Sequence, residues 1–83
     1  MYNSEHMNWN ITAHGITGEI KFSDQTELAE FVLKLAKISD NIAHHADMVI
    51  SYNTLLLTVF THDQQSVTEK DHDLCREIEK LLN

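Results

Sequence analysis

Apolar side chains recur along the chain with two different periods, and the change from one period to the other predicts the order of its secondary structure. Asp24 is a good helix N-cap, and Glu27 follows at the spacing of a capping box. The apolar residues that come next have the spacing of an amphipathic helix: Leu28, Phe31, Val32, Leu35 and Ile42. We expect this helix to run to about Ile42 or Ala43.

Short strands are expected on both sides of this helix. Two of them, at about residues 9–13 and 19–22, come first, with Gly15 and Gly18 in the turn between them. After the helix, "MVISY" and "LLLTVFT" predict an antiparallel hairpin joined through Asn53–Thr54. The second of these runs is apolar on both faces. This indicates a strand that is covered by a helix on one side and by a partner subunit on the other.

A second amphipathic helix is expected from about residue 66 to the C-terminus. Ser66 with Glu69 and Thr68 with Asp71 both have the capping spacing, which leaves its start open by two residues. Its apolar positions are Leu74, Ile78, Leu81 and Leu82. The element order β-β-α-β-β-α predicts an α+β fold, in which both helices pack on one face of an antiparallel four-stranded sheet.

Length and cysteine content predict a small domain that self-associates. The chain has 83 residues, so we expect residues 1–83 to form one domain. A chain of this size buries only about 60% of its unfolded surface, which leaves it marginally stable on its own. Cys75 is the single cysteine, so no internal disulfide can add stability. A lone thiol in an apolar-periodic segment fits core packing in a reducing cytoplasm.

Charge and hydropathy argue against two classes of partner. Lys and Arg total 6 against 13 Asp and Glu, a formal net charge of -7, which disfavours direct binding to nucleic acid. No apolar run approaches the roughly 20 residues that span a bilayer. The first ten residues have neither the charged start nor the apolar middle of a signal peptide. We therefore expect a cytoplasmic protein that contacts neither nucleic acid nor membrane.

The candidate chemistry lies in three histidines. His44 and His45 follow the end of the first helix, and His62 follows the second strand of the hairpin. Imidazole both donates and accepts protons near neutral pH, so three of them around one pocket favour acid–base catalysis. Two alternatives remain open. The pair can be solvent-exposed without a function, or three imidazoles can hold zinc, although no His-Glu-x-x-His spacing supports a metal site.

The spacing D-x3-HH-x6-Y-x9-H-x8-D, from Asp40 to Asp71, resembles the signature of pterin-4a-carbinolamine dehydratases. Residues 68–71, "TEKD", are similar to the family's start of the last helix, and Trp9 is similar to its upstream tryptophan. The resemblance covers residues 9–82. One departure is Ala46, which stands where the family usually has proline.

The resemblance implies a lyase that dehydrates 4a-hydroxytetrahydropterin to the quinonoid dihydropterin in tetrahydrobiopterin recycling, without a metal or cofactor. It implies that His44 and His62 transfer the protons and that His45 positions the pterin or serves the opposite hydroxyl stereoisomer. Asp40, one helical turn before His44, is expected to orient that imidazole within the substrate site. Trp9 either walls the pterin ring or packs in the core.

The same resemblance leaves a second class of function open. Relatives of this fold act as dimerisation cofactors for a transcription factor or as assembly factors without turnover, so a non-catalytic binding module is the alternative. A third possibility is a purely structural small dimer. The resemblance implies a homodimer or a homotetramer, built through sheet edges and helices, and does not choose between them.

Overall fold

The computed structural model describes residues 7–82, and its elements follow the predicted order. A short 3-10 helix, η1, is an addition that the sequence pattern did not predict. The elements are β1 (Asn10–Thr12), β2 (Gly15–Lys21), α1 (Gln25–Ile42), β3 (Asp47–Ser51), β4 (Thr54–Val59), η1 (His62–Gln64) and α2 (Glu69–Leu82).

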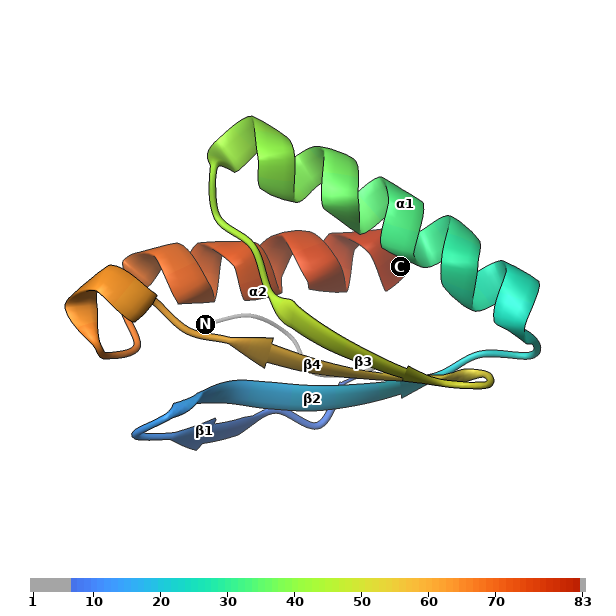
Figure 1. Cartoon of the computed structure of the whole chain (residues 1–83), viewed down its shortest axis with the longest axis horizontal. Helices are drawn as coiled ribbons and strands as arrows, with labels where there is room; N and C mark the ends of the chain where they lie inside the picture. Colours follow the sequence, from blue (N-terminus) through green and yellow to red (C-terminus); the bar gives the residue numbers. More distant parts are fainter. Residues whose placement is uncertain (1–6, 83) are drawn as a thin grey trace.

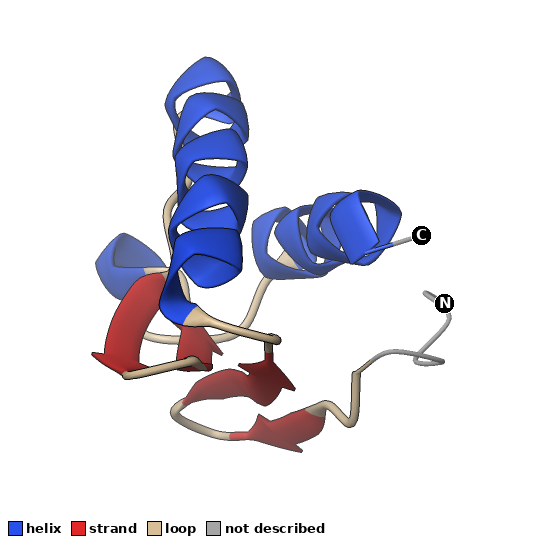
Figure 2. Cartoon of the chain, turned by 90° about the vertical axis from the view of Figure 1, so that its right-hand side faces the viewer, coloured by secondary structure: helices blue, strands red, loops and turns tan. Residues whose placement is uncertain are grey.

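The four strands form one antiparallel sheet in the order β1-β2-β4-β3. Figure 1 shows α1 and α2 above this sheet, and the view turned by 90° in Figure 2 shows both helices on the same face. The predicted α+β fold is therefore confirmed. Among residues 7–82 no helix has the length and apolar character needed to cross a membrane.

The core lies between the two helices and the inner face of β2 and β4. In β4, Leu55, Leu57 and Val59 alternate toward the helices, and all three are fully buried. Full burial of one such side chain contributes roughly 1.5–3 kcal/mol. Cys75 is also fully buried, as predicted for a thiol that packs in the core. The helices and β2 add Ile16, Ile20, Leu28, Phe31, Leu35, Leu74 and Ile78.

Two predicted turns lie elsewhere in the structure. The first turn is at residues 13–14, and Gly15 already begins β2 with a φ of 136°, a conformation that favours glycine. Gly18 lies inside β2, where a Cβ would come within 2.8 Å of Trp9 Cε3, so its role is to let the indole approach. The hairpin turn is at residues 52–53, because Asn53 bonds to the backbone of Phe22 through both its carbonyl and its side-chain amide.

The outer face of the sheet carries an exposed apolar pair on β3 and β4. Val49 of β3 and Leu56 of β4 pair across the ladder and are 61% and 40% exposed. Within residues 7–82 no element covers them, so the helix cover of β4 is confirmed and its cover by a partner subunit stays a prediction.

Candidate active site

Four elements begin or end at one end of the molecule, and the three candidate histidines lie in the connections there. α1 ends and α2 begins at this end, the left-hand side of Figure 1. β3 begins where β4 ends, because the strands are antiparallel with Asp47 paired to Thr58. His44 and His45 lie in the connection from α1 to β3, and His62 begins η1, three residues after the end of β4. The fold therefore brings residues distant in sequence to the same end.

The way α1 ends separates the directions of the adjacent histidines. Ala43 adopts a left-handed C-cap conformation with a φ of 56° and ψ of 38°, and its amide donates to Ser39 O. The His44 amide donates to the same carbonyl at 3.1 Å. This sharp turn ends the helix, as predicted, just before the histidine pair. The His44 side chain is 12% exposed, whereas that of His45 is 57% exposed.

His44 contacts a buried carboxylate. Its Nε2 lies 2.6 Å from Asp71 Oδ1, and the Asp71 side chain is fully buried. The other oxygen, Oδ2, accepts from Thr61 Oγ1 and from the Thr68 amide, both at 2.8 Å. Thr61 has one hydroxyl proton, which goes to Asp71, so the Thr68 hydroxyl donates to Thr61 Oγ1 at 2.7 Å. Of the two capping pairs that the sequence offered, Thr68 with Asp71 is therefore the one that begins α2.

These contacts decide the charge of Asp71. Burial alone would raise the pKa of the Asp71 carboxyl, but hydrogen bonds from His44, the Thr68 amide and Thr61 outweigh burial and hold the pKa below its usual 3.8. Asp71 is therefore ionised at neutral pH and can only accept. It follows that His44 Nε2 carries a proton and donates it to Asp71 Oδ1.

The other two histidines contact carboxylates at the surface. His45 Nε2 lies 2.7 Å from Asp40 Oδ1, and His62 Nε2 lies 3.6 Å from Asp47 Oδ2. Each of these four side chains is more than half exposed. The expectation that Asp40 orients His44 is wrong: α1 ends at Ile42, so His44 is outside the helix and the i, i+4 geometry does not apply. Asp40 contacts His45 instead.

His44 also lines a small cavity between the end of α1 and the outer side of α2. The cavity has a volume of about 240 Å³ and is lined by Ile42, His44, Lys70, Asp73, Arg76, Glu77 and Lys80. Among residues 7–82, neither His45 nor His62 belongs to this lining. Pockets for drug-sized ligands have roughly 300–1,000 Å³. This cavity therefore has room for a small ring system or for part of a ligand.

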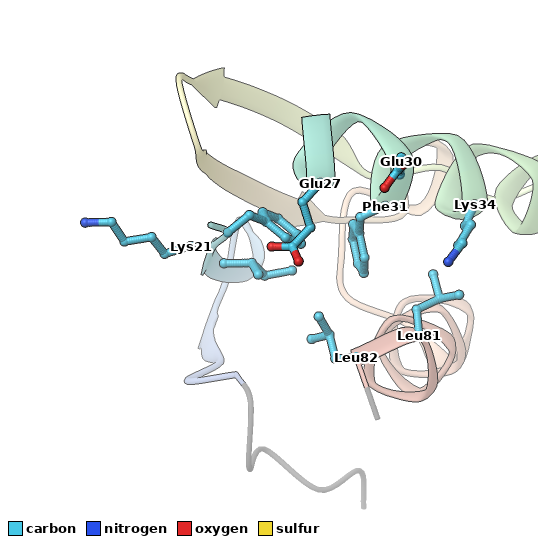
Figure 3. Close-up of a pocket in the computed structure, with 9 residues that line it drawn as sticks. Lys21, Glu27, Glu30, Phe31, Lys34, Leu81 and Leu82 are labelled. Atoms are coloured by element: carbon cyan, nitrogen blue, oxygen red, sulfur yellow. The ribbon is translucent and has the colours of Figure 1, made fainter. Parts of the chain in front are cut away.

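A second cavity, of about 470 Å³, lies at the opposite end of α1. Figure 3 shows Phe31 of α1 facing Leu81 and Leu82 at the end of α2. Charged side chains surround this apolar floor, and the lining residues are Ile20, Lys21, Phe22, Glu27, Glu30, Phe31, Lys34, Leu81 and Leu82. None of the candidate site residues lines it, so its volume gives no support to the histidine site.

Trp9 is half-buried and packs against the core, away from the pair formed by His44 and Asp71. Its Nε1 donates to Glu79 Oε1 at 2.8 Å, and its ring lies over Gly18. Glu79 is eight residues beyond Asp71 on α2, roughly 12 Å along the helix axis. Of the two roles left open for Trp9, these contacts favour core packing over a wall for the pterin.

Sequence reasoning missed the contact between His44 and Asp71. The capping spacing placed Asp71 at the start of α2, but a contact across 27 residues leaves no local pattern.

Among residues 7–82, no group of three or more His, Cys, Asp or Glu side chains is placed to hold a metal ion.

Similarity to known proteins extends over nearly the whole chain. The family model described as pterin 4 alpha carbinolamine dehydratase matches residues 2–81. The chain belongs to this family. It is 36% identical over 73 residues to a provisionally named pterin-4-alpha-carbinolamine dehydratase of Sulfolobus acidocaldarius, covering 88% of this chain and 80% of the relative. It is 39% identical over 74 residues to another from Acidobacterium capsulatum, covering 89% and 80%.

A solved structure has the same fold as this member of the dehydratase family. The protein, described as a transcriptional coactivator/pterin dehydratase from Brucella melitensis, matches with a TM-score of 0.84 at 24% identity. The match covers 95% of this chain and 84% of that one. At this identity the likeness shows the fold alone.

Proposed function

We propose that this protein dehydrates 4a-hydroxytetrahydropterin to the quinonoid dihydropterin by histidine acid–base catalysis. One observation carries the proposal: in a chain of the dehydratase family, His44, His45 and His62 come from two distant connections to the same end of the fold. The elimination needs a proton delivered to the leaving hydroxyl and a proton taken from N5. Imidazoles supply both steps at neutral pH.

The reaction is balanced without an oxidant or a reductant. The C4a–O bond breaks, and the hydroxyl leaves as water after it gains a proton. The N5–H bond gives up its proton, and its electron pair forms the C4a–N5 double bond. Two proton-transfer groups on different sides of the pterin are therefore sufficient. We assign these roles to His44 and His62, which come from different connections.

His45 supplies the third imidazole of the proposed site. Its ring is more than half exposed and is held at its Nε2 by Asp40. A side chain in this position suits a group that positions the pterin or serves the opposite stereoisomer of the hydroxyl. Asp40 then acts on the substrate through His45.

A second candidate function is a non-catalytic module that assembles with another protein. The exposed apolar pair Val49 and Leu56 on the outer face of the sheet favours it. The same pair supports self-association, because a second copy would cover the outer face of β4 that this chain leaves exposed. We propose a homodimer or homotetramer, and a cytoplasmic location in keeping with the single buried thiol of Cys75.

The enzyme and the binding module are separated by one assay on variants. Turnover is followed by the loss of the carbinolamine's ultraviolet absorbance. We expect His62→Ala to lower kcat by roughly 10²-fold or more, the range of general acid–base catalysis, without unfolding the protein. His14→Ala is the matched control, since His14 is an exposed histidine in the turn between β1 and β2. An unchanged rate in His62→Ala removes His62 from the mechanism, and a wild-type protein without turnover favours the module.

A further inference from the structure

We infer that Asp71 is a positioning residue that fixes the tautomer of His44, so that Nδ1 is the nitrogen of His44 that exchanges protons with the substrate. The structural part of this inference stands on the contacts of Asp71. The part about turnover rests on the proposed function.

The two oxygens of Asp71 join three parts of the chain. Oδ1 accepts from His44, which follows α1, and Oδ2 accepts from Thr61, which directly precedes His62. Oδ2 also accepts from the amide of Thr68, at the start of α2. One buried carboxylate therefore sets the position of the His44 ring relative to the backbone that carries His62. A shift of the His44 ring, or of Thr61 beside His62, would break a hydrogen bond to a buried charge.

The protonation of the His44 ring follows from these contacts. An ionised carboxylate has no proton to donate, so Nε2 must carry the hydrogen in the bond to Asp71. In the neutral ring Nδ1 is then the acceptor, and a proton taken from a substrate arrives there. A carboxylate that orients an imidazole in this way selects the tautomer without becoming protonated itself.

The other two imidazoles lack such a partner. The pairs His45–Asp40 and His62–Asp47 are more than half exposed on both sides, so water and salt screen them. Their rings remain able to turn toward a ligand. His44 is thus the fixed member of the proposed catalytic group.

Nuclear magnetic resonance of the nitrogen-15-labelled full chain tests the inference without a substrate. In the wild-type protein, long-range proton–nitrogen correlations are expected to show His44 as the Nε2–H tautomer. Asp71→Asn removes the charge while keeping the shape, and it is expected to release His44 to a mixture of tautomers or to the Nδ1–H form. Glu69→Gln is the matched control: Glu69 is exposed in the same first turn of α2, and this variant is expected to leave the His44 spectrum unchanged.

Turnover measurements separate the inference from the proposed function. For Asp71→Asn we expect kcat to fall by roughly 10²-fold, with KM nearly unchanged, because general acid–base catalysis contributes about 10²–10⁴-fold. A wild-type His44 in the Nδ1–H form, or an Asp71→Asn spectrum identical to wild type, overturns the inference even if turnover is normal. Absent turnover with the expected wild-type tautomer instead overturns the proposed function alone. If Asp71→Asn does not fold, the wild-type spectrum still decides the question.

Discussion

Gly18→Ala tests whether Trp9 belongs to the core or to the substrate site. Gly18 lies in the middle of β2 on the face toward the helices, and the Trp9 ring packs directly over it. An added Cβ would fall 2.8 Å from Trp9 Cε3 and 2.9 Å from Cζ3, and it would also meet the terminal methyl of Met7. The methyl ends a flexible side chain and can move. The indole is held by its bond to Glu79, so it has to shift or strain.

The magnitude follows from three terms. Overpacking by one methyl costs about 1–3 kcal/mol. If the indole shifts, its hydrogen bond to Glu79 is lost, which removes about 1.5–3 kcal/mol for a charged acceptor. Glu79 is only 4% exposed and its Oε2 has no partner among the described residues, so the carboxylate would be left without a donor. Alanine in a strand regains about 0.5–1 kcal/mol relative to glycine. Together the three terms give an expected net destabilisation of about 1.5–5.5 kcal/mol.

Urea unfolding followed by the emission of Trp9, the single tryptophan, measures both the stability and the environment of the ring. In a thermal melt of a domain of this size, a change of one kcal/mol in the free energy of unfolding shifts Tm by roughly 4–8 °C. The effect of Gly18→Ala is expected to shrink in a Trp9→Phe background, because the smaller ring leaves room for the methyl. That background has no tryptophan, so its urea unfolding is followed by circular dichroism. Equal stability and unchanged emission in Gly18→Ala would show that the ring does not lie over Gly18. Trp9 would then return as a candidate wall of the pterin site.

Two further predictions concern the carboxylate of Asp71 and the outer face of the sheet. The lowered pKa of Asp71 means that its stabilisation is present above the usual pKa of 3.8 and is lost as pH falls through the folded value. The stability difference between wild type and Asp71→Asn, measured by urea unfolding, should therefore be constant above about pH 5 and narrow below about pH 4; a gap that widens in acid would contradict this. Val49→Asp should shift the proposed oligomer toward monomer in sedimentation, whereas Leu33→Asp on α1, 57% exposed, should not. The reverse result would place the interface on the helix.

The sequence was most informative where the signal is local. The period of apolar residues and the cap at Asp24 predicted α1 to within a residue, because helix hydrogen bonds join residues four apart. In a capping box Glu27 would accept from the amide of the cap residue, Asp24. Its carboxylate instead accepts from the amide of Ser23, one residue earlier. The turns were less predictable. Asn53 is drawn into the hairpin turn by bonds to Phe22, 31 residues away.

The sequence predicted which histidines belong to the candidate site, but it did not predict which carboxylates they contact. The motif located His44, His45 and His62, but the contact of His44 with Asp71 depends on how the end of α1 and the start of α2 meet in space. Helical spacing favoured Asp40 for His44, and this failed because the left-handed turn at Ala43 takes His44 off the helix. The capping spacing of Asp71 was correct, yet it concerned only one of the two oxygens.

The position of Asp71 also explains why a carboxylate there serves His44 better than Asp40 would. Asp40 lies in the last turn of α1, where the negative end of the helix dipole opposes a carboxylate. Asp71 lies in the first turn of α2, where the positive end favours a carboxylate by about 0.3–1 kcal/mol. His44 comes directly after the C-cap of α1, at the negative end of that helix. Two helix ends of opposite sign therefore meet at one imidazole–carboxylate pair, an arrangement that suits the charge separation of the proposed proton transfer.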